Sequence, residues 1–149
     1  MVKIYQLDAY GGVPAFAERE SPQPQAGEVL IRIAACGLNF ADLLTIEGTY
    51  QDRPTPPVVL GKEFSGTVEA AGKGVTLRPG TRVAVYAGQG GLAEVACIPE
   101  ARCLPIPDAM PFDVAAGFQV AYGTSHVALD RAALKPGETL LVTGAAGGV

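Results

Sequence analysis

Residues 61–99 read GKEFSGTVEAAGKGVTLRPGTRVAVYAGQGGLAEVACIP. Three apolar runs in this stretch predict short strands over residues 63–70, 82–86 and 92–98, because Gly or Pro bounds each run on both sides. Short strands at such close spacing are typical of a small barrel or sandwich. The sequence therefore predicts a mainly β fold with short helices.

Three further strands are expected before this stretch, over residues 3–7, 15–20 and 28–36. The third of these shows the period-two alternation of a strand that is buried on one face. We expect Val29, Ile31 and Ile33 on the buried face, and Glu28, Leu30 and Arg32 on the opposite face.

A short helix is predicted between the third strand and the stretch quoted above. Asn39 has the side chain of an N-cap residue, and apolar residues follow it at helical spacing from Phe40. Gly48 is the expected end of this helix of two turns. Residues 49–57 contain three prolines, so we expect a loop there.

The pattern changes after Pro107. Residues 111–130 predict two helices or one kinked helix, and residues 139–143 form an unbroken apolar run typical of a parallel strand buried on both faces. Such a strand needs neighbours that are reached through crossover helices. We therefore interpret residues 1–107 as one β domain, and residues 108–149 as the first helices and first strand of a truncated α/β domain.

Composition excludes several classes of function. Eleven Lys and Arg against fifteen Asp and Glu give a formal net charge of −4, without the basic cluster that nucleic acids require. No run approaches the roughly 18 apolar residues of a membrane span, and Asp8 interrupts the N-terminus before any secretory signal. The three Cys have no disulfide or zinc-knuckle spacing. We expect a cytoplasmic protein without nucleic-acid or membrane partners.

The last residues form a candidate cofactor site. An apolar strand that runs into a Gly-rich turn can cradle a pyrophosphate, because small residues let the backbone approach it. Ala145 and Gly147 take the first two Gly positions of a GxGxxG pattern, and the third falls beyond Val149. The alternative is an ordinary Gly-rich turn. The candidate cofactor-binding residues here are Gly144, Ala145, Ala146, Gly147, Gly148 and Val149.

Several motifs in the same order resemble one enzyme family. GKEFSG at residues 61–66 resembles the Gly-His-Glu-x-x-Gly signature of medium-chain alcohol dehydrogenases, and CGLNFAD at residues 36–42 is similar to their quinone oxidoreductase branch. The resemblance covers nearly the whole chain. It also includes PGTRVA at residues 79–84, GLAE at residues 91–94 and LVTGAAGGV at residues 141–149.

This resemblance implies a GroES-like β-barrel over residues 1–107, followed by the truncated beginning of an α/β Rossmann domain over residues 108–149. The active site of the family lies in the cleft between the two domains. The family also implies a nicotinamide cofactor, for which we expect NADPH with NADH left open, and a homodimer of the full-length protein.

Two departures from the family pattern argue against zinc. The zinc-dependent members have Cys where this sequence has Asn39, and His where it has Lys62. An amide is a poor zinc ligand beside thiolate and imidazole, and an ammonium group carries positive charge where a cation has to bind. The Cys-rich lobe that holds a structural zinc in many relatives is missing as well. We therefore predict no metal site.

Without a metal, the expected substrate is a quinone or an α,β-unsaturated carbonyl compound. Hydride addition to such an acceptor creates a delocalised anion, which hydrogen-bond donors can stabilise, whereas alcohol oxidation needs zinc. The candidate catalytic donors are Asn39, Tyr50 and Lys62. Tyr50 is included because it resembles an aromatic residue near the substrate in this branch of the family.

Each donor also has a structural interpretation. Asn39 can serve only as a helix cap, and Tyr50 can be a loop tyrosine that seals the barrel. For Lys62 we favour an ion pair with Glu63 or Asp42 over a catalytic charge.

Three further polar residues stand in segments near the expected site. Asp42 is expected to be structural or to orient other groups, because an acceptor-only carboxylate cannot stabilise an enolate. Thr124 matches the family position near the nicotinamide carboxamide, or it bonds its own i−4 carbonyl. His126, the sole histidine, is expected to be structural.

The predicted function is that of the N-terminal part of an NADPH-dependent, zinc-free quinone oxidoreductase, with no turnover by residues 1–149 alone. An enoyl- or acryloyl-CoA reductase, or a 2-alkenal reductase of the same branch, is the alternative among enzymes. A soluble structural protein, as in lens crystallins that resemble this family, is the alternative of another class.

Overall fold

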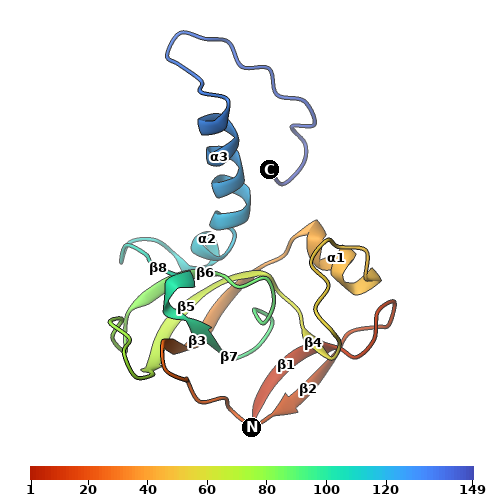
Figure 1. Cartoon of the computed structure of the whole chain (residues 1–149), viewed down its shortest axis with the longest axis vertical. Coiled ribbons are helices and arrows are strands. Elements are labelled where there is room, and N and C mark those ends of the chain that lie inside the picture. The colour runs from red at the N-terminus through yellow and green to blue at the C-terminus, as the bar shows by residue number, and fades with distance from the viewer.

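A computed structural model describes all residues from Met1 to Val149. It contains a three-stranded sheet of order β2-β1-β4 and a five-stranded sheet of order β7-β3-β5-β6-β8, and every strand pair is antiparallel. Figure 1 shows the two sheets at the lower end of the molecule, with α1 beside the smaller sheet and α3 rising away from both. The elements are β1 (Val2–Leu7), β2 (Ala15–Arg19), β3 (Glu28–Gly37), α1 (Phe40–Glu47), β4 (Val58–Val59), β5 (Glu63–Ala71), β6 (Arg82–Tyr86), β7 (Val95–Pro99), the 3-10 helix η1 (Glu100–Arg102), β8 (Cys103–Pro105), α2 (Phe112–Ala116), the π-helix η2 (Gln119–Gly123) and α3 (Thr124–Arg131).

The core belongs to the five-stranded sheet. Phe64 on β5 is fully buried, and aliphatic side chains from the neighbouring strands surround it. Burial of one such side chain contributes about 1.5–3 kcal/mol to folding, so this cluster is the main source of stability. Its members are Val29, Ile31, Phe64, Val68, Val83, Val85, Ala96, Ile98 and Cys103.

The predicted alternation along β3 is wrong at one position. Leu30 was expected on the exposed face, but it is buried like Val29 and Ile31 on either side of it. The pairing of β3 with β5 shifts register between Leu30 and Ile31. A bulge of this kind interrupts the regular alternation of the two faces.

The strand predicted over residues 92–98 begins later, as β7 at Val95. The backbone before Val95 is hydrogen-bonded to another segment, because the N–H groups of Gly91 and Leu92 donate to the carbonyl groups of Gly61 and Leu60. The short strands β4 and β8 and the helix η1 were not predicted. Each has only two or three residues, too few to show a period in the sequence.

The predicted helix start and stop around α1 are confirmed. Asn39 occupies the N-cap position with extended backbone angles, and the Asp42 carboxylate accepts the Asn39 backbone N–H at 2.9 Å. Gly48 ends the helix in the left-handed region at φ +72°. Its N–H donates to the carbonyl of Thr45, which satisfies one of the free groups at the helix end.

Arg82 fastens the chain after β8 to the barrel. Its guanidinium donates to the carbonyl groups of Pro107 at 2.9 Å and Met110 at 2.6 Å, and it lies 4.3 Å from the centre of the Phe112 ring. The helix α2 then packs on β3 and β5. The prediction of two helices or one kinked helix over residues 111–130 is confirmed, since α2, η2 and α3 follow one another there.

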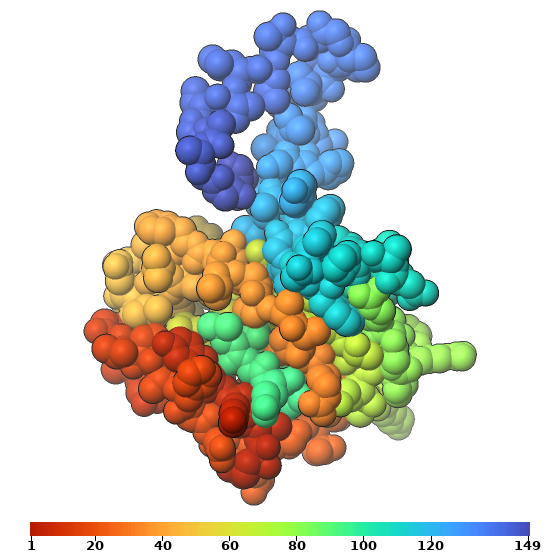
Figure 2. Space-filling view, turned by 180° about the vertical axis from the view of Figure 1, so that it is seen from behind, coloured from red at the N-terminus to blue at the C-terminus, as the bar shows by residue number.

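The strand predicted over residues 139–143 is wrong. These residues have no strand conformation and are exposed, with Leu141 at 85% of its full accessibility. A parallel strand forms only beside hydrogen-bonding neighbours, and no strand of this chain lies next to these residues. Figure 2 shows the end of the chain as a separate arm that bends back beside α3 and stands clear of the barrel. None of the helices has the length and apolar character needed to cross a membrane.

Candidate functional site

The head of α1 brings Asn39 against the beginning of β5. The Asn39 side-chain amide donates from Nδ2 to Oε1 of Glu63 at 2.9 Å. Asp42, one turn into the helix, is buried and accepts the Asn39 backbone N–H. The structural role expected of Asp42 is therefore confirmed, and the Asn39 side chain is held by Glu63.

Lys62 precedes Glu63 and is buried, with 3% of its surface exposed. Its Nζ lies 4.1 Å from the centre of the Tyr50 ring and donates to the Gly88 carbonyl at 3.4 Å. The favoured interpretation as an ion pair is wrong, because Lys62 makes no ion pair and Arg32–Glu69 is the pair that the structure contains. The face of an aromatic ring replaces the carboxylate as the neighbour of the ammonium group.

Two effects on the pKa of Lys62 oppose each other. Burial lowers the pKa of the Lys62 ammonium group, and the negative charges of Asp42 and Asp52 act against this shift. Burial also raises the pKa of Tyr86, with Tyr50 as the next contribution. Tyr50 thus stands between an ammonium group and a second phenol, and the three side chains form one polar cluster at the ends of β5 and β6.

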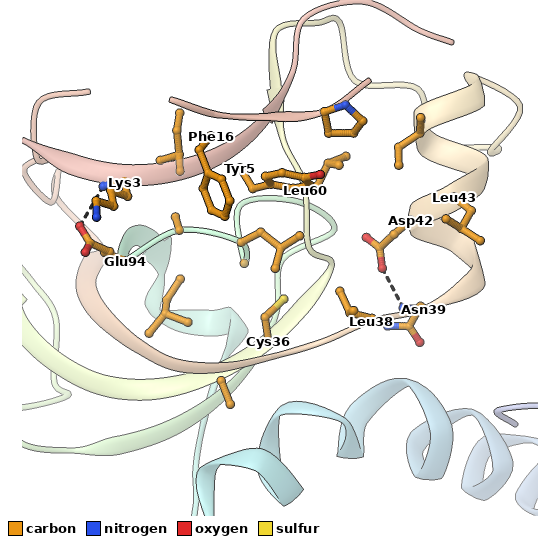
Figure 3. A pocket seen from close by; sticks show the side chains of 18 of the residues that line it. Lys3, Tyr5, Phe16, Cys36, Leu38, Asn39, Asp42, Leu43, Leu60 and Glu94 are labelled. Carbon is orange, nitrogen blue, oxygen red and sulfur yellow. Dashed lines mark hydrogen bonds between the residues drawn. The ribbon is translucent and has the colours of Figure 1, made fainter. Parts of the chain in front are cut away.

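Asn39 also lines an apolar cavity of about 1180 Å³. Figure 3 shows it between the strands of the smaller sheet and α1, with Tyr5 and Phe16 on one wall and Leu43 on the other. The Cys36 thiol points into this space. Burial, with the nearby charges of Asp42 and Glu63, raises the pKa of Cys36 to about 12, so the thiol is not a nucleophile at neutral pH.

The candidate catalytic residues and the candidate cofactor residues lie in separate parts of the molecule. Lys62 contacts Tyr50 beside the ends of β5 and β6, and Asn39 contacts Glu63, the next residue after Lys62. Thr124 begins α3, and it is exposed together with His126 and all of residues 144–149. The i−4 bond considered for Thr124 is made by its neighbour instead, since Ser125 Oγ donates to the Ala121 carbonyl at 2.9 Å.

The Gly-rich end of the chain is exposed and uncrowded. A side-chain carbon added to Gly144 or Gly148 would meet no atom within 4 Å, so the space beside the backbone is open. The Gly147 N–H donates to the Gly144 carbonyl at 3.1 Å, which forms a tight turn. A phosphate needs free backbone N–H donors, and within this turn the Gly147 N–H is already used.

Metal-ligating side chains do not gather anywhere in the chain. No group of three or more His, Cys, Asp or Glu side chains is placed so that it could hold a metal ion. The three Cys are free, and two of them, Cys36 and Cys103, have pKa values of about 12 and about 11 because of burial.

The role of Glu63 in this site is not predicted from the sequence, where Glu63 is named only as an ion-pair partner of Lys62. It is 3% exposed and accepts hydrogen bonds from Asn39 Nδ2 and from the Val120 backbone N–H. An acidic residue at the beginning of an apolar strand was the available signal. Buried carboxylates need partners, so such a residue indicates a hydrogen-bonded site.

Residues 25–108, more than half of the chain, match the alcohol dehydrogenase GroES-like domain. The chain belongs to this family. Its GroES-like barrel carries the Asn39 and Lys62 site, and the family is that of the medium-chain dehydrogenases. Several relatives and solved structures that resemble the chain are named as quinone oxidoreductases.

Individual relatives agree with this assignment. The GroES-like chain is 41% identical to quinone oxidoreductase-like protein 2 homolog of Nematostella vectensis, over 91% of this chain and 39% of the relative. It is 40% identical to the synaptic vesicle membrane protein VAT-1 homolog of Danio rerio, over 96% of this chain and 31% of the relative. The chain therefore spans only 31–39% of the length of these relatives.

Solved structures give the same result. The quinone oxidoreductase of Pseudomonas syringae superimposes with a TM-score of 0.91 at 36% identity, covering 99% of this chain and 47% of the other. The quinone oxidoreductase of Thermus thermophilus, whose complex with NADPH has been solved, gives 0.87 at 39% identity, over 98% of this chain and 46% of the other. The expected family and fold are thus confirmed.

Proposed function

We propose that residues 1–149 are the N-terminal part of an NADPH-dependent, zinc-free quinone oxidoreductase that reduces a quinone or another α,β-unsaturated carbonyl compound. The observation that carries this proposal is the pair Asn39 and Lys62. At the two positions where zinc-dependent members of the family have ligands, this chain holds an amide and a buried ammonium group. Both are hydrogen-bond donors, and neither is a good ligand for zinc.

Lys62 supplies the positive charge of the site. Reduction of a conjugated acceptor leaves negative charge on its oxygen, and donors in a buried site stabilise that charge more than donors in water. The single hydrogen bond of Lys62, to Gly88, leaves two of its three N–H groups free. Because burial lowers the pKa of this group, it also gives up a proton to the reduced oxygen more readily than an exposed lysine does.

Asn39 and Tyr50 complete the donor set. One N–H of the Asn39 amide is used by Glu63, and the second remains for a substrate oxygen. Tyr50 holds the Lys62 ammonium group against its ring face and offers a flat surface to a quinone ring. The three side chains thus bind and orient the acceptor and take up its developing charge.

Thr124 and residues 144–149 are the proposed contacts to the cofactor, which supplies the hydride when it is bound. The NADPH complexes of the Thermus thermophilus enzyme and of a mycobacterial neighbour at 31% identity support this part of the proposal. We further propose a cytoplasmic homodimer for the full-length protein, and no turnover by residues 1–149 alone, since they form no α/β domain around the Gly-rich turn.

The test is a steady-state assay of the full-length protein with benzoquinone, a 2-alkenal and acryloyl-CoA, each with NADPH and with NADH. We expect benzoquinone and NADPH to be preferred, with no loss of activity after treatment with a chelator. Lys62→Met should lower kcat/KM for benzoquinone roughly 100-fold, as expected for the loss of one oxyanion donor. Lys73→Met, at an exposed lysine, is the control. A clear preference for acryloyl-CoA, or inactivation by the chelator, would contradict the proposal.

A further inference from the structure

The Glu63 carboxylate lies at the junction between the barrel and the helical segment that follows it. Its two oxygens have different partners. Oε1 accepts the Asn39 Nδ2 at 2.9 Å, and Oε2 accepts the backbone N–H of Val120 at 3.0 Å. With 3% of the residue exposed, this carboxylate is shielded from water and depends on these two donors.

The Glu63 side chain is closely packed against the backbone of β3. A side-chain carbon added to Gly37 would lie 2.9 Å from both Cγ and Oε1 of Glu63, and 2.6 Å from the carbonyl oxygen of Ala116. The Glu63 side chain and α2 therefore both approach β3 closely at Gly37, where only a residue without a side chain fits. A group that is packed in this way holds its hydrogen-bond partners in a defined direction.

This contact decides which way the Asn39 amide faces. The two ends of an amide have almost the same shape, so packing alone does not distinguish its oxygen from its nitrogen. A carboxylate is only an acceptor, and it therefore selects the orientation in which Nδ2 faces Glu63. The second hydrogen on the same nitrogen is then the group left to meet a substrate oxygen.

The other oxygen of Glu63 acts on the helical segment. In a continuous α-helix the Val120 N–H would donate to the carbonyl four residues earlier, but here it donates to Glu63. The residues from Gln119 to Gly123 form a π-helix at this point, and α3 with Thr124 follows directly. Turns of this kind are frequent at functional sites.

We propose that Glu63 is a positioning residue, which sets the donor direction of Asn39 and at the same time ties Asn39 to the segment that leads to Thr124. The inference rests on the proposed function in assigning Asn39 to the substrate. The hydrogen-bond geometry that carries it is independent of the reaction.

The decisive experiment observes the Asn39 side-chain amide by ¹⁵N NMR in the 149-residue chain. The Asn39 signals are those that disappear in Asn39→Asp. In Glu63→Gln, which keeps the size of the side chain, we expect the signals to move and the bonded hydrogen to exchange roughly tenfold faster, the factor for one charge-assisted hydrogen bond. In the same variant, the backbone N–H of Val120 should also exchange faster with solvent. Glu69→Gln, at the exposed partner of Arg32, is the matched control and should leave both unchanged.

A second measurement covers the case in which Glu63→Gln does not fold. In Asn39→Ala the ¹³C carboxyl signal of Glu63 is expected to shift, and that of Glu69 is expected to stay. Unchanged Asn39 signals in a folded Glu63→Gln, or an unchanged Glu63 signal in Asn39→Ala, overturns the inference.

Kinetics of the full-length protein separate this inference from the proposed function. Glu63→Gln should lower kcat for benzoquinone roughly tenfold with little change in KM, and in the Asn39→Ala background it should have almost no further effect. If Glu63→Gln lowered kcat by the same factor in the Asn39→Ala background as in the wild type, the positioning role would be overturned. A wild-type enzyme that reduces no quinone, in spite of the expected NMR changes, would overturn the proposed function and leave the positioning contact in place.

Discussion

The barrel and the segment after Pro107 contrast in how their apolar residues are covered. In the barrel, antiparallel strands from one continuous stretch of chain bury Phe64 and its neighbours completely. In the later segment, Leu141 and Val142 are as apolar but remain exposed, at 85% and 59%. Figure 2 shows this difference as a closed body with a separate arm.

The contrast shows that an apolar run does not fold without neighbours. Antiparallel strands joined by short turns bring their own hydrogen-bonding partners, whereas a parallel strand depends on partners reached through longer connections. Residues 139–143 have the composition of a buried strand, and no other strand of this chain is next to them. The three predictions below test this difference between the two regions.

The largest expected effect is the loss of a core side chain from the barrel. Phe64→Ala should lower the free energy of unfolding by about 3–5 kcal/mol, because it removes a fully buried ring and leaves a cavity. Urea unfolding followed by circular dichroism measures this change. The paired variant in the other region is Leu141→Ala, for which we expect a change within about 0.5 kcal/mol, as for exposed positions in general.

Equal losses in these two variants would contradict the comparison. They would mean that residues 139–143 are packed against the barrel in solution. A large loss in Phe64→Ala alone would confirm that the barrel holds the stability of the chain.

A smaller effect is expected where the two regions meet. Gly37→Ala should destabilise the chain by about 1–3 kcal/mol, because the added carbon would lie 2.6 Å from the Ala116 carbonyl oxygen and 2.9 Å from the Glu63 side chain. Gly117→Ala is the matched control, since no atom lies within 4 Å of the carbon that it adds. Thermal unfolding of both variants gives the answer, and a Gly37→Ala protein as stable as the control would show that α2 is not seated on the barrel.

The smallest expected effect is on the stability of the barrel at acidic pH. The Thr76 side chain and the backbone N–H groups of Leu77 and Thr76 lower the pKa of Glu100 below its ordinary value of 4.5. A lowered pKa in the folded state stabilises the protein above about pH 4.5, and this contribution is lost as the pH falls through the folded-state value.

In Glu100→Gln the free energy of unfolding should therefore depend less on pH below pH 4.5 than in the wild type. Its pH dependence near neutrality should be unchanged. Unfolding experiments on Glu100→Gln and the wild type between pH 3 and pH 7, at about constant ionic strength, measure this change. A Glu100→Gln profile that falls with acid as steeply as that of the wild type would contradict the assignment of this acid sensitivity to Glu100.

Much of the barrel was predictable from local signals. Strand positions such as residues 82–86 follow from apolar runs between Gly and Pro, and the cap at Asn39 and the stop at Gly48 follow from backbone preferences of single residues. Leu30 was placed on the wrong face because a register shift depends on the partner strand. The strands β4 and β8 are too short to carry a pattern.

The site was predictable in its members more than in their contacts. Asn39, Tyr50 and Lys62 were named from a resemblance and from their donor chemistry, and the structure joins Lys62 to Tyr50 and Asn39 to Glu63. Their catalytic roles stay a prediction, as does the division of the chain at residue 107. The partners of Lys62 and Asn39 were not foreseen, because sequence neighbours such as Glu63 compete with groups that only the folded chain brings close.

The order of amino acids was enough to establish the family, the strands of the barrel and the absence of two zinc ligands at positions 39 and 62, since these follow from residue types and short spacings. Packing in three dimensions placed an aromatic ring beside Lys62, gave the Glu63 carboxylate its two donors and left residues 139–143 uncovered. Burial and hydrogen-bond partners are properties of groups far apart along the chain, and they come into existence when the strands pair.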